Sequence, residues 1–305
     1  MAETLIIVNP RSAGGRTGRR WPEIERGLRA RLPVFDIAFT ERPGHATAIA
    51  REATARYGRI ALVGGDGTLN EVVNGLIADD RPLRPDLALG IIPYGTGGDF
   101  VRSVGIPRDL DGAAERLVTG TPREVDVGKV VYRRPDGSEG TRYFINEGEI
   151  GMGAAVCEAV NRNSKRWGGR LSFLRAILLT ALRYPDQSIM LALDGAPAER
   201  VIINNIWLAN GQYSGGGIRS GPRARLDDGL LDVVQIGASG MLEKLMGLPK
   251  LRSGAFVDRP NVVYRTARRV DAESEASVPV EVEGEPIGTL PASFEVIGER
   301  LLVIA

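Results

Sequence analysis

A carboxylate stands among glycines at residues 64–68, where the sequence reads Gly-Gly-Asp-Gly-Thr. An apolar run at 60–63 precedes it, and apolar residues at the spacing of one helix face follow within 72–76. This pattern predicts a strand, a glycine turn and a helix. Glycines let backbone N–H groups approach a phosphate, and the N-terminus of a helix favours negative charge. The carboxylate of Asp66 would repel that phosphate unless a divalent metal ion or a proton lay between them. An ordinary turn followed by an N-capped helix is the alternative interpretation.

A second loop of similar composition, Asn-Pro-Arg-Ser-Ala-Gly-Gly at residues 9–15, follows an apolar run at 4–8. A helix is expected after it, from about 18 to 32. A strand that runs into such a loop and then a helix is typical of the first unit of an α/β nucleotide-binding fold. The loop contains neither GxxxxGK nor GxGxxG, so the sequence excludes a Walker P-loop here and gives no support to a Rossmann dehydrogenase.

Two more expected strands, at 34–39 and 87–92, end in residues that can contact a ligand. The first leads to Thr40, and the second leads to PYGTGGDF, which contains Thr96 and Asp99. Because open α/β sheets bind ligands at the carboxyl ends of their strands, we expect these ends to lie beside the glycine turn. The alternative for Asp99 is that it caps the helix that follows.

The run GGDGTLNEVVNG at residues 64–75 closely resembles the signature of the diacylglycerol kinase catalytic family. That family includes bacterial soluble lipid kinases and sphingosine kinases, and its superfamily includes NAD kinases and phosphofructokinases. The resemblance implies that ATP and Mg²⁺ are the cofactors, and that Asp66 is a catalytic residue that holds Mg²⁺ directly or through water. It also implies that the nucleotide is bound by Asn9, Pro10, Arg11, Ser12, Ala13, Gly14, Thr40, Gly64, Gly65, Asp66, Gly67, Thr68, Leu69, Asn70, Glu71 and Thr96.

Two motifs nearer the C-terminus extend the resemblance. In the run DDGLLDVV, the acid of the D-G-L triplet implies a structural Mg²⁺ held by Asp228 and by the backbone carbonyls of Arg225 and Leu230. Adjacent aspartates before a turn can also form a plain Asx turn. The run Glu-Gly-Glu at 283–285 stands where the family has D-G-E, which implies that Glu285 is the general base for the acceptor hydroxyl. A solvated hairpin is the alternative there.

The sequence departs from the family pattern at three places. Gly98 replaces an Asn, Glu283 replaces an Asp, and Met152-Gly153 replaces an aromatic residue followed by an acid. Gly98 and Met152-Gly153 motivate an alternative, a nucleotide- or lipid-binding module without activity. Another hypothesis is an NAD kinase, which shares GGDGT and the Asn-Glu after it. DDGLLDVV and Glu-Gly-Glu favour the lipid kinases, and thus the transfer of the γ-phosphoryl group of ATP to a hydroxyl of a lipid such as diacylglycerol. A sphingoid base, a polyprenol or a glycolipid headgroup would need a similar apolar cleft.

The chain has 305 residues, of which 43% are hydrophobic and 25% charged, the balance of a globular protein with room for two domains. The net charge of +1 argues against a nucleic-acid partner. The single cysteine, Cys157, excludes an internal disulfide and suits a reducing cytoplasm, and the single histidine, His45, is expected to cap or pack. Neither a signal-peptide pattern nor about eighteen consecutive apolar residues is present, so we expect a cytoplasmic protein that contacts a lipid acceptor transiently at a membrane surface. A homodimer is compatible with the sequence, which does not determine the oligomeric state.

These motifs need two structural units to position them. Residues 1–123, with a C-terminal strand at 291–305, predict a Rossmann-like α/β nucleotide-binding domain. Short alternating runs within 124–290 predict an antiparallel β-sandwich domain that binds the acceptor, with the active site in the cleft between the domains. Residues 121–123 are expected to be a linker. A nearly all-apolar helix at 171–184 is expected to be either a core helix or a lipid-facing helix.

Overall fold

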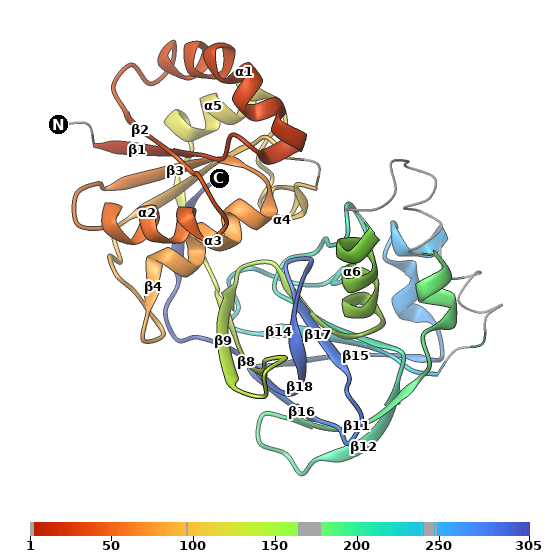
Figure 1. The fold of residues 1–305 in the computed structure, drawn as a ribbon. Coiled ribbons are helices and arrows are strands. Elements are labelled where there is room, and N and C mark those ends of the chain that lie inside the picture. The colour runs from red at the N-terminus through yellow and green to blue at the C-terminus, as the bar shows by residue number, and fades with distance from the viewer. Residues whose placement is uncertain (1–2, 96, 164–177, 239, 241–246, 248) are drawn as a thin grey trace.

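The chain folds into two parts, which Figure 1 draws mainly in red to yellow and in green to blue, and the blue C-terminal strand returns to the first part. The computed structural model describes residues 3–95, 97–163, 178–238, 240, 247 and 249–305. The first part is a mostly parallel sheet between two layers of helices, and the second is a curled antiparallel sheet. The expected fold class, a Rossmann-like α/β domain followed by an antiparallel β domain, is confirmed.

Six strands form the sheet of the first part, in the order β2-β1-β3-β6-β19-β7. They are β1 (Thr4–Val8), β2 (Asp36–Phe39), β3 (Arg59–Gly64), β6 (Ala88–Pro93), β7 (Pro122–Val125) and β19 (Leu301–Ile304). Neighbouring strands are parallel except β19 and β7, which pair antiparallel. The strands β1, β3 and β6 are buried apolar runs because helices cover both faces of the sheet.

Helices α1 (Ser12–Arg29) and α5 (Leu110–Thr119) cover one face of this sheet, and α2 (His45–Ala53) and α3 (Asp66–Leu76) cover the other (Figure 1). A short helix, α4 (Asp99–Val104), follows β6. The helices α2 and α3 pack closely on each other, since a Cβ on Gly75 would lie 2.4 Å from Thr47 O. Because α3 starts directly after β3, the glycine turn between them lies at the carboxyl edge of the sheet.

The second sheet has the order β12-β11-β16-β18-β17-β10-β13-β14-β15, and the hairpin of β8 and β9 joins it through β18. Its strands are β8 (Gly128–Arg133), β9 (Glu139–Phe144), β10 (Glu147–Gly151), β11 (Gln187–Leu193), β12 (Glu199–Ile203), β13 (Asn205–Ala209), β14 (Leu231–Ile236), β15 (Val262–Ala267), β16 (Arg269–Glu273), β17 (Pro279–Val282) and β18 (Glu285–Val296). All these neighbours pair antiparallel. The sheet curls around an apolar core in which Phe144 and Phe294 meet edge to face.

Smaller elements complete the described chain. Helix α6 (Met152–Asn163) packs against β10, β17 and β18. The short strands β4 (Ile77–Ala78) and β5 (Arg81–Pro82) form a hairpin after α3, and a 3₁₀ helix, η1 (Ala255–Asp258), precedes β15. Among the described residues, no helix is long and apolar enough to cross a membrane. The helix expected at 171–184, as either a core helix or a lipid-facing helix, lies partly outside the described residues, because 171–177 are not among them.

The expected linker at residues 121–123 is wrong. Pro122–Val125 forms β7, which pairs with β19 at the edge of the first sheet. The side chains of Pro122, Arg123 and Glu124 are exposed, as is common in an edge strand. Because these residues lack the apolar pattern of a buried strand, the sequence analysis did not predict a strand here.

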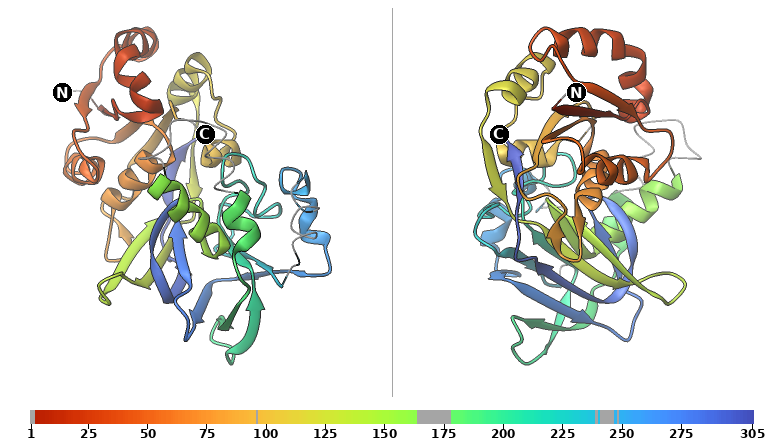
Figure 2. Two further views of the ribbon diagram at one scale, coloured as in Figure 1. Left: turned by 45° about the vertical axis from the view of Figure 1, so that its right-hand side comes forward. Right: turned by 90° about the vertical axis from the view of Figure 1, so that its left-hand side faces the viewer.

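The chain crosses back to the first part at its C-terminus, and Figure 2 shows the blue terminal strand rising into the first sheet. The C-terminal segment 291–305 was expected to return to the first domain as a strand. Only β19 does so, because residues up to Val296 belong to β18 and pair with β16 and β8 in the second sheet. Antiparallel pairing with a strand on each side holds these residues in the second part.

Candidate active site

A cavity of about 580 Å³ lies where the two parts meet. The loops after β1, β2, β3 and β6 line it from the first part. The segments before β10 and between β17 and β18, together with Gly215 and Gly216, line it from the second. This is the carboxyl edge of the parallel strands, where open α/β sheets bind ligands.

Asp66 is held at this edge by close contact between two glycine loops. Its Oδ2 accepts a hydrogen bond from Gly98 N at 2.7 Å, and a Cβ on Gly97 would lie 2.3 Å from the same oxygen. A Cβ on Gly95 would lie 2.6 Å from Gly65 Cα. Larger residues at 95 and 97 would therefore push the loops apart, and Asp66 would lose its amide partner.

The loop after β1 is tied to the same turn. Asn9 Nδ2 donates to Thr68 Oγ1 at 2.9 Å, and Asn9 Oδ1 accepts from Arg11 N at 3.0 Å. Ala13 has a φ of 51°, a left-handed conformation that is strained for a residue with a side chain. Asn9, Arg11, Ser12 and Ala13 line the cavity, as expected for a loop that would bind phosphate.

Thr40 and Glu71 also line the cavity. The carboxylate of Glu71 accepts hydrogen bonds from Gly44 N at 2.9 Å and Ala46 N at 3.1 Å, so it caps the start of α2. His45 Nδ1 accepts from Glu41 N at 3.1 Å, a contact with the loop before α2 and not a cap of the helix amides.

Several predicted nucleotide-binding residues do not line the cavity. Leu69 is buried in the core of the first part, and the side chain of Asn70 donates to Tyr143 O at 2.8 Å and accepts from Arg142 Nε at 2.8 Å. Asn70 thus connects the two parts of the molecule. Pro10, Gly14 and Gly64 do not line the cavity, whereas Gly65, Gly67 and Thr68 do. Thr96 lies outside the described residues.

Glu285 reaches the cavity from the start of β18. A Cβ on Gly67 would lie 3.6 Å from Glu285 Oε1, so this carboxylate stands directly against the glycine turn. Glu285 Oε2 accepts a hydrogen bond from Arg142 Nη2 at 2.7 Å, and half of its side chain is exposed. The structure therefore brings together the two residues expected to be catalytic, Asp66 and Glu285, although they are far apart in the sequence.

Four further acids line this cavity: Glu41, Asp99, Glu147 and Glu283. The sequence analysis expected Asp99 at this edge of the sheet, and it did not place the other three there as site residues. Glu283 Oε1 accepts from Ile145 N at 2.8 Å and Asn146 N at 2.9 Å. Burial raises the pKa of Glu283 to about 7, although these two hydrogen bonds oppose the shift. Glu283 occupies the position of the Asp in the family motif D-G-E, and this match could have identified Glu283 as a site residue from the sequence.

Asp99 supplies an oxygen atom that fits a metal ion. Its Oδ2 accepts from Gly216 N at 2.6 Å, while Oδ1 is buried and accepts no hydrogen bond from any residue that the structure describes. Burial raises the pKa of Asp99, the amide of Gly216 lowers it, and the charge of Asp66 raises it further. Two neighbouring carboxylates with an unpaired buried oxygen are suited to Mg²⁺, which prefers oxygen ligands.

The Asp-Asp-Gly loop lies apart from this cavity. Asp228 Oδ1 accepts from Leu230 N at 3.1 Å, which is an Asx turn, and Arg225 pairs with Asp227 at 3.3 Å. The Mg²⁺ site of Asp228 with the carbonyls of Arg225 and Leu230 stays a prediction. Behind the loop, the buried carboxylate of Asp126 accepts from Gly229 N and from Arg300 Nε, both at 2.6 Å. The sequence analysis missed Asp126 and Arg300, because neither belongs to a recognisable motif.

Comparisons with known proteins agree with this architecture. Residues 3–130 match the family model described as diacylglycerol kinase catalytic domain. Residues 148–305 match the model described as YegS C-terminal NAD kinase beta sandwich-like domain.

Similar proteins match over nearly the whole chain. A probable YegS-like lipid kinase of Chromohalobacter salexigens is 32% identical over 93% of this chain and 87% of its own length. A diacylglycerol kinase of Bacillus subtilis is 31% identical over 96% and 93%.

Two solved structures extend the comparison to the fold. A putative diacylglycerol kinase from Bacillus anthracis is 26% identical, with a TM-score of 0.77 over 99% of this chain and 96% of that one. An NAD kinase from Archaeoglobus fulgidus in complex with ATP, 14% identical, has a TM-score of 0.51 over 99% and 93%, a likeness in fold alone.

Proposed function

This chain belongs to the diacylglycerol kinase catalytic family, and on that premise we propose that it is an ATP-dependent lipid kinase. It transfers the γ-phosphoryl group of ATP to a hydroxyl of a lipid, with diacylglycerol as the first candidate acceptor. The names of the relatives support this choice, and the DDGLLDVV and Glu-Gly-Glu stretches favour it over an NAD kinase. Because such an acceptor resides in a membrane, the proposal includes transient contact with a membrane surface.

The observation that carries the proposal is that Asp66 and Glu285 meet across one cavity, from two different parts of the molecule. Phosphoryl transfer depends mainly on positioning and on neutralising charge. It needs a site for phosphates and metal next to a group that can accept a proton from the attacking hydroxyl. Asp66 with the glycine turn fits the first need, and Glu285 fits the second.

In this proposal, different residues of the cavity bind the phosphates, hold the metal ion and accept the proton. The loop of Asn9 to Ala13 and the turn from Gly65 to Thr68 would orient the phosphates through backbone amides and the Arg11 side chain. Asp66 and Asp99 would hold Mg²⁺, which when bound neutralises the charge of the phosphates. Glu285 would accept the proton of the acceptor hydroxyl, and Arg142 fixes the position of its carboxylate.

The test measures phosphate transfer from γ-labelled ATP with Mg²⁺. The acceptors are diacylglycerol, a sphingoid base and a polyprenol in detergent micelles, plus NAD. Asp66→Asn and Glu285→Gln are compared with Glu115→Gln, a change of the same kind on the exposed side of α5. We expect one lipid to be labelled, a loss of about 100-fold or more in each site variant, and no change in the control.

Each other outcome has a definite meaning. Labelling of NAD alone would assign the chain to the NAD kinase activity. Binding of ATP without labelling of any acceptor would support the module without activity, for which Gly98 and Met152-Gly153 are the motivation. Labelling that survives both site substitutions would contradict the roles given to Asp66 and Glu285.

A further inference from the structure

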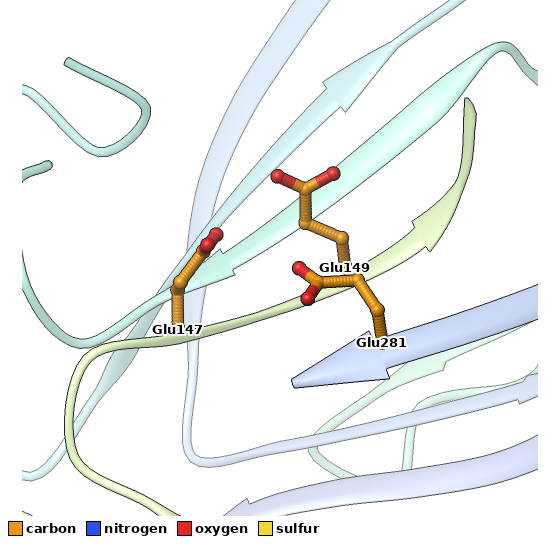
Figure 3. A group of neighbouring side chains, drawn as sticks. All are labelled: Glu147, Glu149 and Glu281. Carbon is orange, nitrogen blue, oxygen red and sulfur yellow. The ribbon is translucent and has the colours of Figure 1, made fainter. Parts of the chain in front are cut away.

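Three glutamates gather beneath α6 in the second sheet. Glu147 and Glu149 lie two residues apart on β10 and so point to the same face, and Glu281 on β17 stands opposite Glu149 in the strand register. One carboxylate oxygen from each lies within 4.8 Å of the other two. Figure 3 shows the three side chains rising from these strands, with the carboxylates of Glu147 and Glu281 turned toward each other.

All three carboxylates are buried, since their residues are only 4%, 7% and 1% exposed. No Lys or Arg of the described chain forms an ion pair with any of them. Glu147 Oε2 and Glu281 Oε2 are fully enclosed and accept no hydrogen bond from a described residue. Uncompensated buried charges are costly, so this group must take up either protons or a cation.

The surroundings of Glu149 resemble those of a metal ligand. Trp207 Nε1 and Asn205 Nδ2 both donate hydrogen bonds to its carboxylate, and Gly153 N in turn donates to Asn205 Oδ1 at 2.8 Å. Such neighbours fix the orientation of ligating carboxylates in metal sites. A Cβ on Gly153 would lie 1.3 Å from Glu149 Oε2, so the absence of a side chain at 153 is what makes room for this carboxylate.

A route from solvent is present, because Glu147 also lines the cavity between the two parts. The cluster offers only oxygen atoms, since no Cys or His of the described residues belongs to it. Hard divalent cations such as Mn²⁺, Mg²⁺ and Ca²⁺ prefer oxygen ligands at about 2.1–2.6 Å. Two ligands of one such ion are therefore at most about 4–5 Å apart, and the three oxygens lie within that limit of one another.

We propose that Glu147, Glu149 and Glu281 bind one hard divalent cation inside the second sheet. This site is separate from Asp66 and from Asp228, and it stands on its own geometry rather than on the proposed activity. The cation joins β10 to β17 and neutralises charges that otherwise repel each other. Because Glu147 also lines the cavity, the ion enters and leaves through it.

The experiment counts Mn²⁺ ions bound to the full chain after treatment with EDTA, from the paramagnetic signal of free Mn²⁺. The background carries Asp66→Asn and Asp228→Asn, so that each of the two other predicted metal positions loses a carboxylate ligand. We expect one bound Mn²⁺ in this background. Adding Glu149→Gln and Glu281→Gln, which keep shape but remove charge, should weaken that binding about 100-fold or more.

Two results would overturn the proposal. One is that the background binds no Mn²⁺, with Mg²⁺ and Ca²⁺ also failing to raise its thermal unfolding temperature. The other is that the two Gln substitutions leave Mn²⁺ binding unchanged, which would place the ion in the cavity. If the Gln variant does not fold, Tb³⁺ bound to the background is excited through tryptophan, and emission that survives Trp207→Phe contradicts a site beside Trp207.

Discussion

At the scale of single residues, the acids of the cavity differ in what their oxygens contact. Asp66 accepts from the amide of Gly98, Glu283 accepts from two amides, and Glu285 pairs with an arginine. Backbone amides fix the positions of the carboxylates of Asp66 and Glu283. Glu285, in contrast, keeps half of its side chain exposed. Of these three acids, Glu285 is therefore the one best placed to meet a substrate that enters from solvent.

Arg142 is expected to act through Glu285. Its Nη2 donates to Glu285 Oε2 at 2.7 Å, and its Nε donates to Asn70 Oδ1 at 2.8 Å, so it links the proposed base to α3. Substitution Arg142→Gln should lower kcat about 10-fold and leave KM for ATP nearly unchanged, because the base loses its orientation while the phosphate loops stay intact. Steady-state kinetics on the lipid identified above measure both constants. Arg134→Gln, in the exposed turn after β8, is the control and should change neither. A rise in KM for ATP with constant kcat would instead place Arg142 at the nucleotide.

At the scale of elements, glycines set how closely neighbouring segments approach. Gly95 and Gly97 let the turn after β6 lie against the turn after β3. Gly75 does the same for two helices, because a Cβ there would lie 2.4 Å from Thr47 O and 2.8 Å from Ala50 Cβ. The packing of α2 on α3 thus depends on a residue that is unfavourable for an isolated helix.

Gly75→Ala should therefore destabilise the protein by about 2 kcal/mol, because overpacking outweighs the gain of about 1 kcal/mol in helix propensity. Gly27→Ala on α1 is the matched control, since its Cβ would lie 3.4 Å from Leu110 Cδ2, an ordinary contact. That control should stabilise the protein by about 0.5–1 kcal/mol. Urea unfolding of the two variants beside the wild type gives both differences. Equal stabilisation by both substitutions would show that α2 can move away from α3 at little cost.

At the scale of the whole molecule, two strands far apart in sequence join the two parts. The chain leaves the first sheet after β7 and returns to it as β19. Arg300, just before β19, reaches the buried carboxylate of Asp126, just after β7, and also Asp227 O at 2.8 Å. The crossing point is therefore stabilised by charge as well as by strand pairing.

Removing β19 should prevent stable folding. Leu302 and Val303 pair with β6, and Leu301 to Ile304 pair with β7, so β19 is a central strand of the first sheet. A chain that ends at residue 297 would expose the edge of β6 and leave β7 without its partner. We expect it to be insoluble or to lose cooperative thermal unfolding, whereas removal of Ala305 alone should have little effect. A soluble truncated chain with an unchanged unfolding temperature would contradict this role.

Breaking the Arg300 contact should cost less than losing the strand. The Asp126 side chain is 2% exposed and that of Arg300 36%, so Arg300→Met would leave a buried carboxylate without its cation. We expect a loss of about 2 kcal/mol in unfolding free energy, smaller than for a fully buried pair because Arg300 is partly solvated. In the double variant Arg300→Met/Asp126→Asn much of this loss should be recovered. Additive losses would mean that the two side chains do not interact energetically.

The sequence by itself determined the features that depend on local pattern. Neighbouring residues are enough to predict the strand before the glycine turn and the helix after it. They also predict the short strands of the second half of the chain, in which apolar and polar residues alternate. The motifs around Asp66 and Glu285 were recognisable for the same reason, because each is a short run with its own chemistry.

Only the tertiary structure decided which distant residues share a site. Glu147 and Glu281 meet because β10 and β17 pair in one particular register, and shifting a strand by one residue would turn its glutamates to the other face. Asn70 lies in the signature run, yet it contacts Tyr143 of β9 and not the cavity, because helical periodicity turns it toward the second part. The edge strand β7 was predicted to be a linker for a related reason. It is a strand because it pairs with β19, which lies far along the chain.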